Sequence, residues 1–395
     1  MGCREVKINN KKPVLHNIRI LDFTWVLAGP YATRLLADFG AEVVKVQPLR
    51  PPEADDAFTR AYYNTFNRNK LGITLNLDRP EGVALARRLV ATCDAVAENF
   101  TPRVMANWGL DYANLKNIRP DIIMLSMSVM GQTGPWRDFT GFGPTVQAFS
   151  GLTAMTSFPG QPPTGIGFSY ADHAAGLYAS LALLGALEYR RRTGEGQHID
   201  LSQVEAAASL LGGGVLDYAM SGREPPPAGN ASPRAAPHDV YRCRDGRWCA
   251  VAVFTDTEWK GLKRALGSPA WADASRFATL SGRLANIEEV GGKVAAWMKG
   301  RTAAAAMSVL QENGVAAGVV QDAGDLARDP QLKARDFFIP AKNAFTDATP
   351  IKMSAAPARY QRPAPPPGRD NDDVYRRLLG LGREEIAGLR EKGVI

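Results

Sequence analysis

The sequence is poor in cysteine and histidine, the residues on which disulfide scaffolds and most zinc sites depend. Its 395 residues include four cysteines, and none of them shows a CxxC or other metal-ligand spacing. So few cysteines in so long a chain are typical of a reducing cytosol and not of a secreted disulfide framework. The four histidines are scattered, at positions 16, 173, 198 and 238. We therefore expect a cytoplasmic protein without a metal site.

Other absences narrow the function further. No uncharged apolar run reaches the length of a membrane span, and the first residues have no apolar signal core, so we expect no membrane association. Neither GxGxxG nor a GxxxxGKS or GxxxxGKT motif occurs, which argues against a nicotinamide cofactor or a nucleoside triphosphate bound in the usual way. The formal net charge of +7 is modest, and the basic residues are interspersed with acidic ones. This pattern disfavours nucleic acid as a partner but suits a phosphorylated small ligand. We expect no tightly bound cofactor.

The first half of the chain alternates between strand and helix patterns. Residues 18–23 form a short apolar run, residues 28–40 open with Ala-Gly-Pro and end at a glycine, and residues 42–46 form a second apolar run. This order predicts a strand, a helix and a parallel strand joined by a right-handed crossover. The alternation continues with a helix at 80–93 and strands at 72–77, 95–98 and 122–126. We predict an α/β fold with a doubly wound parallel sheet.

The second half has the composition of a linker and a smaller domain. Residues 198–201 are strand-like, and Ser202 with Glu205 forms a capping box that begins a helix. After a linker at 221–237, rich in Pro, Gly, Ala and Ser, a hairpin is expected around Asp245-Gly246. A helix capped at Thr255, with Glu258 three residues on, should follow it. Helices at 286–299 and 302–313 and a strand at 315–320 follow. We therefore divide the chain into a large domain at 1–220, the linker, a small α+β domain at 238–325, and a return to the large domain at 326–395.

One carboxylate, Asp172, occupies a distinctive position. It lies where a long apolar helix is expected to begin, with Leu177, Leu181 and Leu184 at helical spacing after it. At or near the N-cap, a carboxylate meets free backbone N–H groups and the positive end of the helix dipole, which favours its ionised form. Capping alone would explain Asp172, so its candidacy as a nucleophile depends on the rest of the chain.

Taken together, several stretches make the chain resemble the class III CoA-transferases, a family that also contains 2-methylacyl-CoA racemases. The resemblance covers most of the chain. It is carried by LDFTWVLAGPYATRLLADFGAEVVKVQ at 21–47, NRNKLGITLNL at 67–77, AENF at 97–100, WGLDY at 108–112, GQTGPW at 131–136, ADHAAGLYASLALLGAL at 171–187 and RRTGEGQHIDLSQVEA at 191–206.

The resemblance implies a mechanism, a set of substrate contacts and an assembly. The family aspartate that matches Asp172 attacks the acyl-CoA donor, and the enzyme then carries CoA as an aspartyl thioester to an acceptor acid. Phe100 would face the adenine ring and Arg79 or Arg103 the phosphates. The chain would form an open ring, two rings would interlock as a dimer, and the partner would be a second copy or a paralogous subunit. The full set of implied CoA contacts is Leu27, Ala28, Leu75, Arg79, Asn99, Phe100 and Arg103.

Two departures from the family bear on the acceptor. Several relatives have glutamine where this chain has Leu27, and a glycine-rich loop where it has GNASPRAAPHDV at 229–240. With Trp25, Leu27 predicts an apolar acceptor site, which favours an aryl-substituted succinate, as in benzylsuccinate CoA-transferase. Two alternatives remain open. One is a racemase, although residues 141–144 contain no histidine, and the other is a non-catalytic acyl-CoA-binding subunit.

Overall fold

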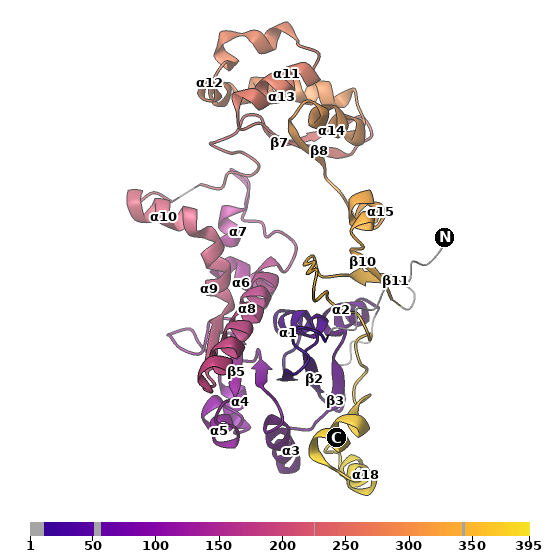
Figure 1. Ribbon diagram of the computed structural model, residues 1–395. Helices are drawn as coiled ribbons and strands as arrows, with labels where there is room; N and C mark the ends of the chain where they lie inside the picture. Colours follow the sequence, from indigo (N-terminus) through magenta and orange to yellow (C-terminus); the bar gives the residue numbers. More distant parts are fainter. Residues whose placement is uncertain (1–11, 51–56, 225, 342–343) are drawn as a thin grey trace, which may run out of the picture. The chain divides into compact units, whose positions relative to one another are not determined.

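The computed structural model describes residues 12–50, 57–224, 226–341 and 344–395. These residues form two compact units (Figure 1). The large unit contains the described chain up to Thr153, together with Gly165–Arg223 and Arg335–Ile395. The small unit contains Ala154–Thr164 and Glu224–Ala334. The chain therefore leaves the large unit and later returns to it.

A parallel sheet of six strands forms the centre of the large unit. Its strand order is β3-β2-β1-β4-β5-β6, and every neighbouring pair is parallel. The order reverses between β1 and β4, so the predicted doubly wound α/β sheet is confirmed. The strands are β1 (Arg19–Asp22), β2 (Glu42–Gln47), β3 (Leu71–Thr74), β4 (Ala95–Glu98), β5 (Ile123–Ser128) and β6 (His198–Ser202).

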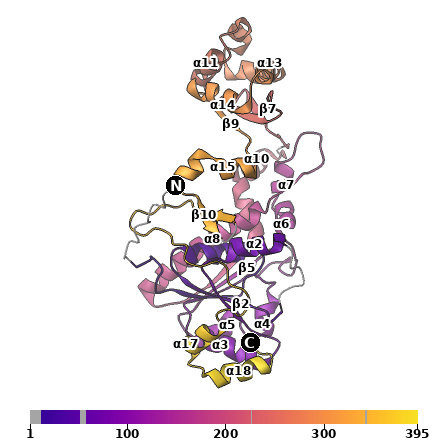
Figure 2. The same cartoon turned by 90° about the vertical axis from the view of Figure 1, so that its right-hand side faces the viewer.

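Helices cover both faces of this sheet (Figure 2). On one face α1 and α8 enclose an apolar core with alternate strand residues, and on the other α3, α5, α17 and α18 enclose a second core. The helices outside the small unit's core are α1 (Ala28–Asp38), α2 (Ala57–Asn67), α3 (Pro80–Val90), α4 (Arg103–Asn107), α5 (Tyr112–Ile118), α6 (Gly143–Phe149), α7 (Leu152–Met155), α8 (Tyr170–Thr193), α9 (Gln203–Ala208), α10 (Gly212–Ser221), α17 (Asn371–Leu379) and α18 (Arg383–Glu391).

Helix α8 packs through small residues and not through its leucines. Ala171, Ala175 and Ala179 are fully buried, and a side chain at Gly176 would come within 2.9 Å of the Ala28 carbonyl oxygen on α1. Leu177, Leu181 and Leu184, whose spacing predicted the helix, are instead 53%, 67% and 41% exposed. The periodicity therefore identified the helix, but its apolar stripe is free within a single chain.

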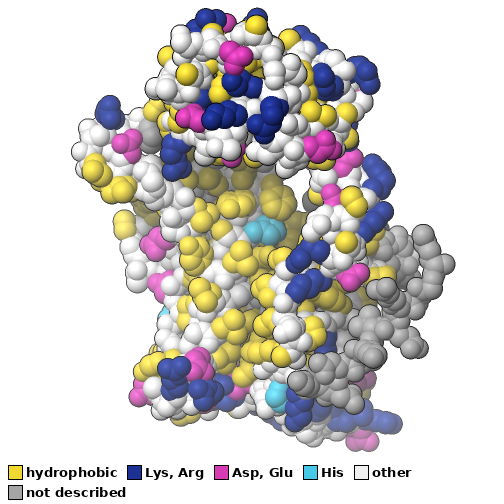
Figure 3. Space-filling view, turned by 45° about the horizontal axis from the view of Figure 1, so that its top comes forward, with side chains coloured by type: hydrophobic (Ala, Val, Ile, Leu, Met, Phe, Trp, Pro, Cys, Tyr) yellow, Lys and Arg dark blue, Asp and Glu magenta, His cyan; other side chains and the backbone are white. Residues whose placement is uncertain are grey.

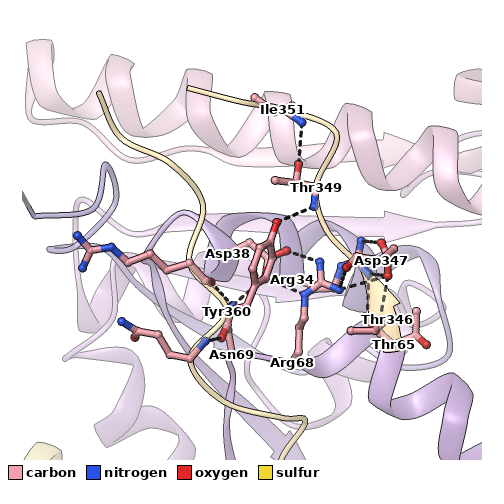
Figure 4. Close-up of polar contacts among 12 residues, drawn as sticks. Arg34, Asp38, Thr65, Arg68, Asn69, Thr346, Asp347, Thr349, Ile351 and Tyr360 are labelled. Carbon is pink, nitrogen blue, oxygen red and sulfur yellow. Dashed lines mark hydrogen bonds and ion pairs between the residues drawn. The ribbon is translucent and has the colours of Figure 1, made fainter. Parts of the chain in front are cut away.

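The returning segment is fastened to α1 and to the end of α2 by buried charges (Figure 4). Arg34 donates two hydrogen bonds to the Asp347 carboxylate, at 3.2 and 3.0 Å. Arg68 donates two to Asp38, at 3.0 and 2.6 Å, and also pairs with Asp347. Asp347 ends the hairpin of β10 (Phe338–Ala341) and β11 (Ala344–Asp347). The two pairs that involve Asp347 join residues 279 and 313 positions apart in the sequence, whereas Arg68 and Asp38 are 30 positions apart.

The small unit is an α+β structure built on an antiparallel sheet, β7-β8-β9. The predicted hairpin is present, with Gly246 at a φ of 77° between its strands, and Thr255 and Glu258 form the predicted capping box. The elements are β7 (His238–Arg242), β8 (Trp248–Ala252), α11 (Asp256–Ala265), α12 (Leu280–Ala285), α13 (Ile287–Lys299), α14 (Ala303–Glu312), β9 (Ala316–Val319), α15 (Ala323–Arg328) and α16 (Pro330–Ala334). No helix among the described residues is both long and apolar enough to cross a membrane.

Candidate active site

Asp172 is the third residue of α8, within the first turn of the helix and not at its cap, which is Ser169. Its side chain is 8% exposed, and the carboxylate accepts a hydrogen bond from its own backbone N–H. Burial raises the pKa of Asp172 to about 6. The helix N-terminus favours ionisation, as the sequence predicts, but loss of water outweighs it. A carboxylate with this pKa is still mostly ionised at pH 7 and is poorly solvated.

Two residues outside α8 define the space around this carboxylate. Gly143 begins α6, and a Cβ atom there would lie 2.3 Å from Asp172 Oδ2 and 2.8 Å from Ser169 Oγ. Tyr62 on α2 is close enough for the charge of Asp172 to affect it. Burial, with that charge as the second cause, raises the pKa of Tyr62 to about 12. The hydroxyl of Tyr62 therefore stays protonated near a carboxylate that has room only because residue 143 is glycine.

His173, next to Asp172, lies among aromatic rings. Its ring centroid is 4.9 Å from Tyr31, 5.8 Å from Phe66 and 4.8 Å from Phe168, on which it stacks. Its Nδ1 lies 2.8 Å from the Ser169 carbonyl oxygen. A carbonyl oxygen can only accept, so Nδ1 carries the proton. The imidazole is thus bonded to the backbone and not to Asp172, unlike the His and Asp pair expected of a racemase.

The loop after β1 has its side chains partly in the core and partly in solvent. Leu27 and Ala28 are 2% and 1% exposed. The prediction that the Leu27 side chain lines an acceptor pocket is therefore wrong, because this side chain is buried beneath the start of α1. Trp25 is 50% exposed and remains available to a ligand. Leu27 and Ala28 can meet CoA only through their backbone.

Asn99 holds this loop to the end of β4. The Trp25 N–H donates to Asn99 Oδ1 at 2.8 Å, and Asn99 Nδ2 donates to the Trp25 carbonyl at 3.0 Å. The next residue, Val26, has a φ of 63°, which is a strained backbone for a β-branched side chain. Strain of this kind persists only where neighbours fix the chain, and it clusters at functional sites. Asn99 provides that fixation here.

Phe100 packs between two tryptophans at the same edge of the sheet. Its ring centroid is 6.3 Å from Trp25 and 5.7 Å from Trp108, and the side chain is half-buried. The Phe100 N–H donates to Glu98 Oε2 at 2.7 Å, and burial raises the pKa of Glu98 to about 7. The structure therefore brings Asn99 and Phe100 together with Trp25, as expected from adjacent strands whose carboxyl ends meet at one edge.

The remaining predicted contacts differ in their availability. Leu75 is 3% exposed and belongs to the core against which Phe100 packs. Arg79 is exposed at the start of α3. The side chain of Arg103 is 72% exposed and lies 3.5 Å from Asp138. The two arginines can turn toward a phosphate, whereas the Leu75 side chain cannot reach a ligand.

Sequence reasoning missed Tyr62 and Gly143. Tyr62 lies on α2, which no pattern predicted, because the segment is short and polar residues interrupt its apolar spacing. Gly143 was noted only for the absence of histidine around it, and its role depends on a contact across 29 residues of sequence. A glycine immediately before Pro144 at a helix start was the available signal. No group of three metal-ligating residues occurs in the part of the chain that the structure describes.

Comparison with known proteins supplies the context for this geometry. The chain is 37% identical to the succinyl-CoA–D-citramalate CoA-transferase of Chloroflexus aurantiacus, over 96% of this chain and 98% of that protein. It is 36% identical to the succinate–glutarate CoA-transferase of Agrobacterium fabrum, over 95% and 98% of the two chains. Both relatives are CoA-transferases by name, and the similarity extends over nearly their full length.

A solved structure and a family model agree with these relatives. The crystal structure of a CAIB/BAIF family protein from Brucella suis superposes with a TM-score of 0.86 at 32% identity, covering 93% of this chain and all of that one. The model of CoA-transferase family III matches residues 15–371. Asp172, Asn99 and Phe100 all lie inside the matched region. By sequence and by fold, the chain belongs to CoA-transferase family III.

Proposed function

We propose that this CoA-transferase moves CoA from succinyl-CoA to a short dicarboxylic acid, with Asp172 as the residue that carries the CoA. One observation supports this most directly. The buried Asp172 carboxylate has no cationic partner in the described part of the chain. A buried carboxylate in a structural ion pair would be occupied, whereas an unpaired and weakly hydrated one is reactive. The names of the two relatives support the donor, which is succinyl-CoA in the first, and the size of the acceptor, which is D-citramalate in the first and glutarate in the second.

The proposed cycle consists of four acyl transfers. Asp172 attacks the thioester carbonyl of succinyl-CoA, and the C–S bond breaks to give a mixed anhydride and CoA thiolate. The thiolate attacks the aspartyl carbonyl, which releases succinate and leaves CoA on Asp172 as a thioester. The acceptor carboxylate displaces the thiolate to form a second anhydride. The thiolate then attacks the acceptor's acyl carbon, which yields the new acyl-CoA and restores the carboxylate.

Each transfer passes through an oxyanion that needs hydrogen-bond donors. The free N–H groups at the start of α8 lie within one turn of Asp172, and the protonated Tyr62 hydroxyl lies near it. Proposed contacts to CoA are the backbone of Leu27 and Ala28, the ring of Phe100 for the adenine, and Arg79 or Arg103 for the phosphates. Asn99 would hold the loop that carries Trp25 in position for these contacts.

The acceptor can also be larger. An apolar groove of about 320 Å³ runs along the exposed side of α8, and Leu177, Leu181 and Leu210 are among its lining residues. This groove keeps an aryl-substituted succinate as a second candidate, on grounds other than the buried Leu27. An acid panel with succinyl-CoA as donor, read by mass spectrometry of the CoA products, separates the two. Preference for glutarate-sized acids supports the first candidate, and preference for benzylsuccinate supports the second.

We also propose the interlocked dimer, formed with a second copy of this chain. Helix α10 has no buried residue, and its apolar side chains lie in solvent: Val215, Leu216 and Met220 are 59%, 59% and 80% exposed. Apolar side chains on a helix without a buried face are typical of a surface that a partner covers. A paralogous subunit would cover the same surface. Purification of the untagged chain alone distinguishes the two partners, because a homodimer forms in the absence of a paralogous subunit.

The test of the covalent role compares Asp172→Asn with a matched control, Asp336→Asn, at an exposed turn residue whose φ of 49° asparagine also tolerates. Wild type and control mixed with succinyl-CoA should gain a CoA-sized mass that hydroxylamine removes. Asp172→Asn should gain none and keep less than about one hundredth of the transfer rate, a loss above ~2.7 kcal/mol. A full adduct on Asp172→Asn would refute the nucleophile. Absence of any adduct on wild type would favour a non-catalytic acyl-CoA-binding subunit. Uptake of deuterium from solvent at the α-carbon of the acyl-CoA would favour a racemase.

A further inference from the structure

The hydroxyl of Ser169 takes no part in capping α8, although Ser169 is the N-cap residue of that helix. Ser169 and Asp172 are the N-cap and the third helical residue, which lie on one side of a helix. In a capping box the N-cap hydroxyl would accept the N–H of the third residue. Here the Ser169 side chain caps no N–H group of α8, and the Asp172 carboxylate accepts its own backbone N–H.

The Ser169 hydroxyl and the Asp172 carboxylate face the same point beside α6. A Cβ atom built on Gly143 would lie 2.3 Å from Asp172 Oδ2 and 2.8 Å from Ser169 Oγ. Two atoms this close to one point are near each other. Among the residues that the structure describes, the Ser169 hydroxyl has no hydrogen-bond partner. Its proton is therefore available to a new acceptor at Oδ2.

The backbone around Ser169 is fixed on both sides. The Ser169 carbonyl oxygen accepts the backbone N–H of His173 at 3.2 Å and the Nδ1–H of the same residue at 2.8 Å. The carbonyl oxygen of Phe168 accepts from Gln147 on α6 at 2.6 Å, and Gln147 is 3% exposed. Only rotation about the Cα–Cβ bond then moves Oγ. Directing the hydroxyl at a developing charge therefore costs little conformational entropy.

The surroundings of Ser169 and Asp172 contain much apolar surface. Ala171, the residue before Asp172, is fully buried and belongs to one apolar cluster with Val146 on α6. Hydrophobic side chains predominate on the face of the large unit that Figure 3 shows. A hydrogen bond to a charged oxygen is stronger where water is scarce. One hydroxyl placed here can therefore have a large effect on a developing negative charge.

We propose that the Ser169 hydroxyl donates a hydrogen bond to Asp172 Oδ2 when this oxygen becomes the oxyanion of an attacked aspartyl carbonyl group. The inference deepens the proposed function and depends on it. It assigns the attack on the donor to Oδ1, and the carbonyl oxygen of the anhydride and of the thioester to Oδ2.

The hydroxyl acts in the two transfers that take place at the aspartyl carbon. In the second transfer the CoA thiolate adds to this carbon, and the electron pair of the C=O bond moves onto Oδ2. The pair returns as the bond from the aspartyl carbon to the succinate oxygen breaks. In the third transfer the acceptor carboxylate adds and the thiolate leaves by the same route. Ser169 keeps its proton throughout.

The contact would favour the transition state over the resting enzyme. The hydroxyl is not bonded to the resting carboxylate, so a bond formed only as charge gathers on Oδ2 raises kcat. Removal of one oxyanion donor from an enzyme costs about 10²–10³ in rate. Ser169 must rotate into place and shares the charge with other donors, so we expect a loss of at least about tenfold.

The experiment follows the covalent CoA adduct in single turnovers at saturating succinyl-CoA, by mass spectrometry of quenched samples. Ser169→Ala should form the adduct at least about tenfold more slowly than wild type. Its isolated adduct should return CoA to added succinate more slowly by a similar factor, because both directions share one transition state. The succinyl-CoA concentration that gives half the maximal rate should change by less than about twofold. Ser169→Cys keeps the shape but has a weak donor, and should be as slow as Ser169→Ala.

Ser202→Ala is the matched control, because Ser202 is the N-cap of α9 and its hydroxyl does cap. It accepts the Glu205 N–H at 3.2 Å. Loss of a working cap lowers stability, so Ser202→Ala should lower the urea midpoint and keep the rate of adduct formation. Ser169→Ala should show the reverse, with an unchanged midpoint and a slower adduct.

Three results would overturn the inference. Adduct formation at the wild-type rate in Ser169→Ala would leave the hydroxyl without a catalytic role, and the same rate in Ser169→Cys would make Ser169 a packing residue. Equal slowing in Ser169→Ala and Ser202→Ala would reduce the effect to the loss of a cap. In each case an adduct on wild type leaves the proposed function standing. Absence of the adduct on wild type itself refutes the proposed function as well.

Discussion

Replacing Gly143 by alanine tests the geometry of the site with a single methyl group. The new Cβ would lie 2.3 Å from Asp172 Oδ2 and 2.8 Å from Ser169 Oγ. Ordinary carbon contacts are about 3.5–4.0 Å, so either the carboxylate or the start of α6 must move by on the order of 1 Å. A displacement of that size at a reacting group costs about a hundredfold in rate, or ~2.7 kcal/mol of transition-state stabilisation. Overpacking should also cost about 1–3 kcal/mol of stability.

The assay follows the initial rate of CoA transfer, the yield of the covalent CoA adduct and the thermal midpoint. Gly292→Ala is the control, since it lies on the exposed side of α13 with no atom within 4 Å of the added Cβ. The control should keep full activity and gain up to about 1 kcal/mol of stability from helix propensity. Wild-type kcat/KM and adduct yield in Gly143→Ala would show that Asp172 does not react from the position described.

Three further predictions concern stability and assembly. The pKa of Asp172 is raised in the folded state from 3.8 to about 6, so its ionisation lowers the stability of the fold progressively as pH rises through that window. In urea titrations Asp172→Asn should therefore be more stable than wild type at pH 7, by roughly 2–3 kcal/mol at most, and no more stable at pH 3.5. Arg34→Leu removes a side chain that is 2% exposed and bonded to Asp347, and should lower the free energy of unfolding by about 2–3 kcal/mol in the same titration. The loss should be smaller than for an isolated ion pair, because Arg68 still contacts Asp347. An unchanged midpoint would contradict a structural role for these charges. Leu216→Asp on α10 should yield monomers in analytical ultracentrifugation, whereas wild type should exchange no subunits between two tagged preparations, and rapid exchange would rule out interlocking.

Elements with a strong local signal were predictable from the sequence. The order of strands and helices in the first half follows from alternating apolar runs, Pro and Gly punctuation, and the right-handed crossover. The cap at Thr255 and the turn at Gly246 depend on neighbours within a few residues, and both are present. The attachment of β11 to α1 through Arg34 and Asp347 was not predictable, because it links residues 313 positions apart that carry no periodic pattern.

The site divides in the same way. Asp172 at a helix start, and Asn99 and Phe100 at a strand end, follow from local patterns and from the resemblance. The burial of Leu27, which is 2% exposed, does not, because it depends on tertiary packing around the loop after β1 and not on the residues next to it in the sequence. For the same reason Tyr62 and Gly143 emerged only in three dimensions. Local patterns indicate which residues occupy the edge of the sheet, whereas packing between helices decides which side chains remain open to a ligand.

The pKa of Asp172 connects this packing to the chemistry that we propose for the residue. A carboxylate near its ordinary pKa of 3.8 is well solvated, and attack on a thioester would first require it to lose that water. A carboxylate buried without a helix N-terminus would be protonated at pH 7 and inert. Burial combined with the first turn of α8 places the pKa at about 6, where about nine tenths of the population is ionised at pH 7 while the hydration shell is already reduced. Burial alone would make Asp172 a poorer leaving group, and the positive end of α8 offsets this because it favours the return of negative charge to the carboxylate. The proposed nucleophilic role therefore needs Asp172 both recessed and at a helix start, and moving the residue by one helical turn in either direction would remove one of these two conditions.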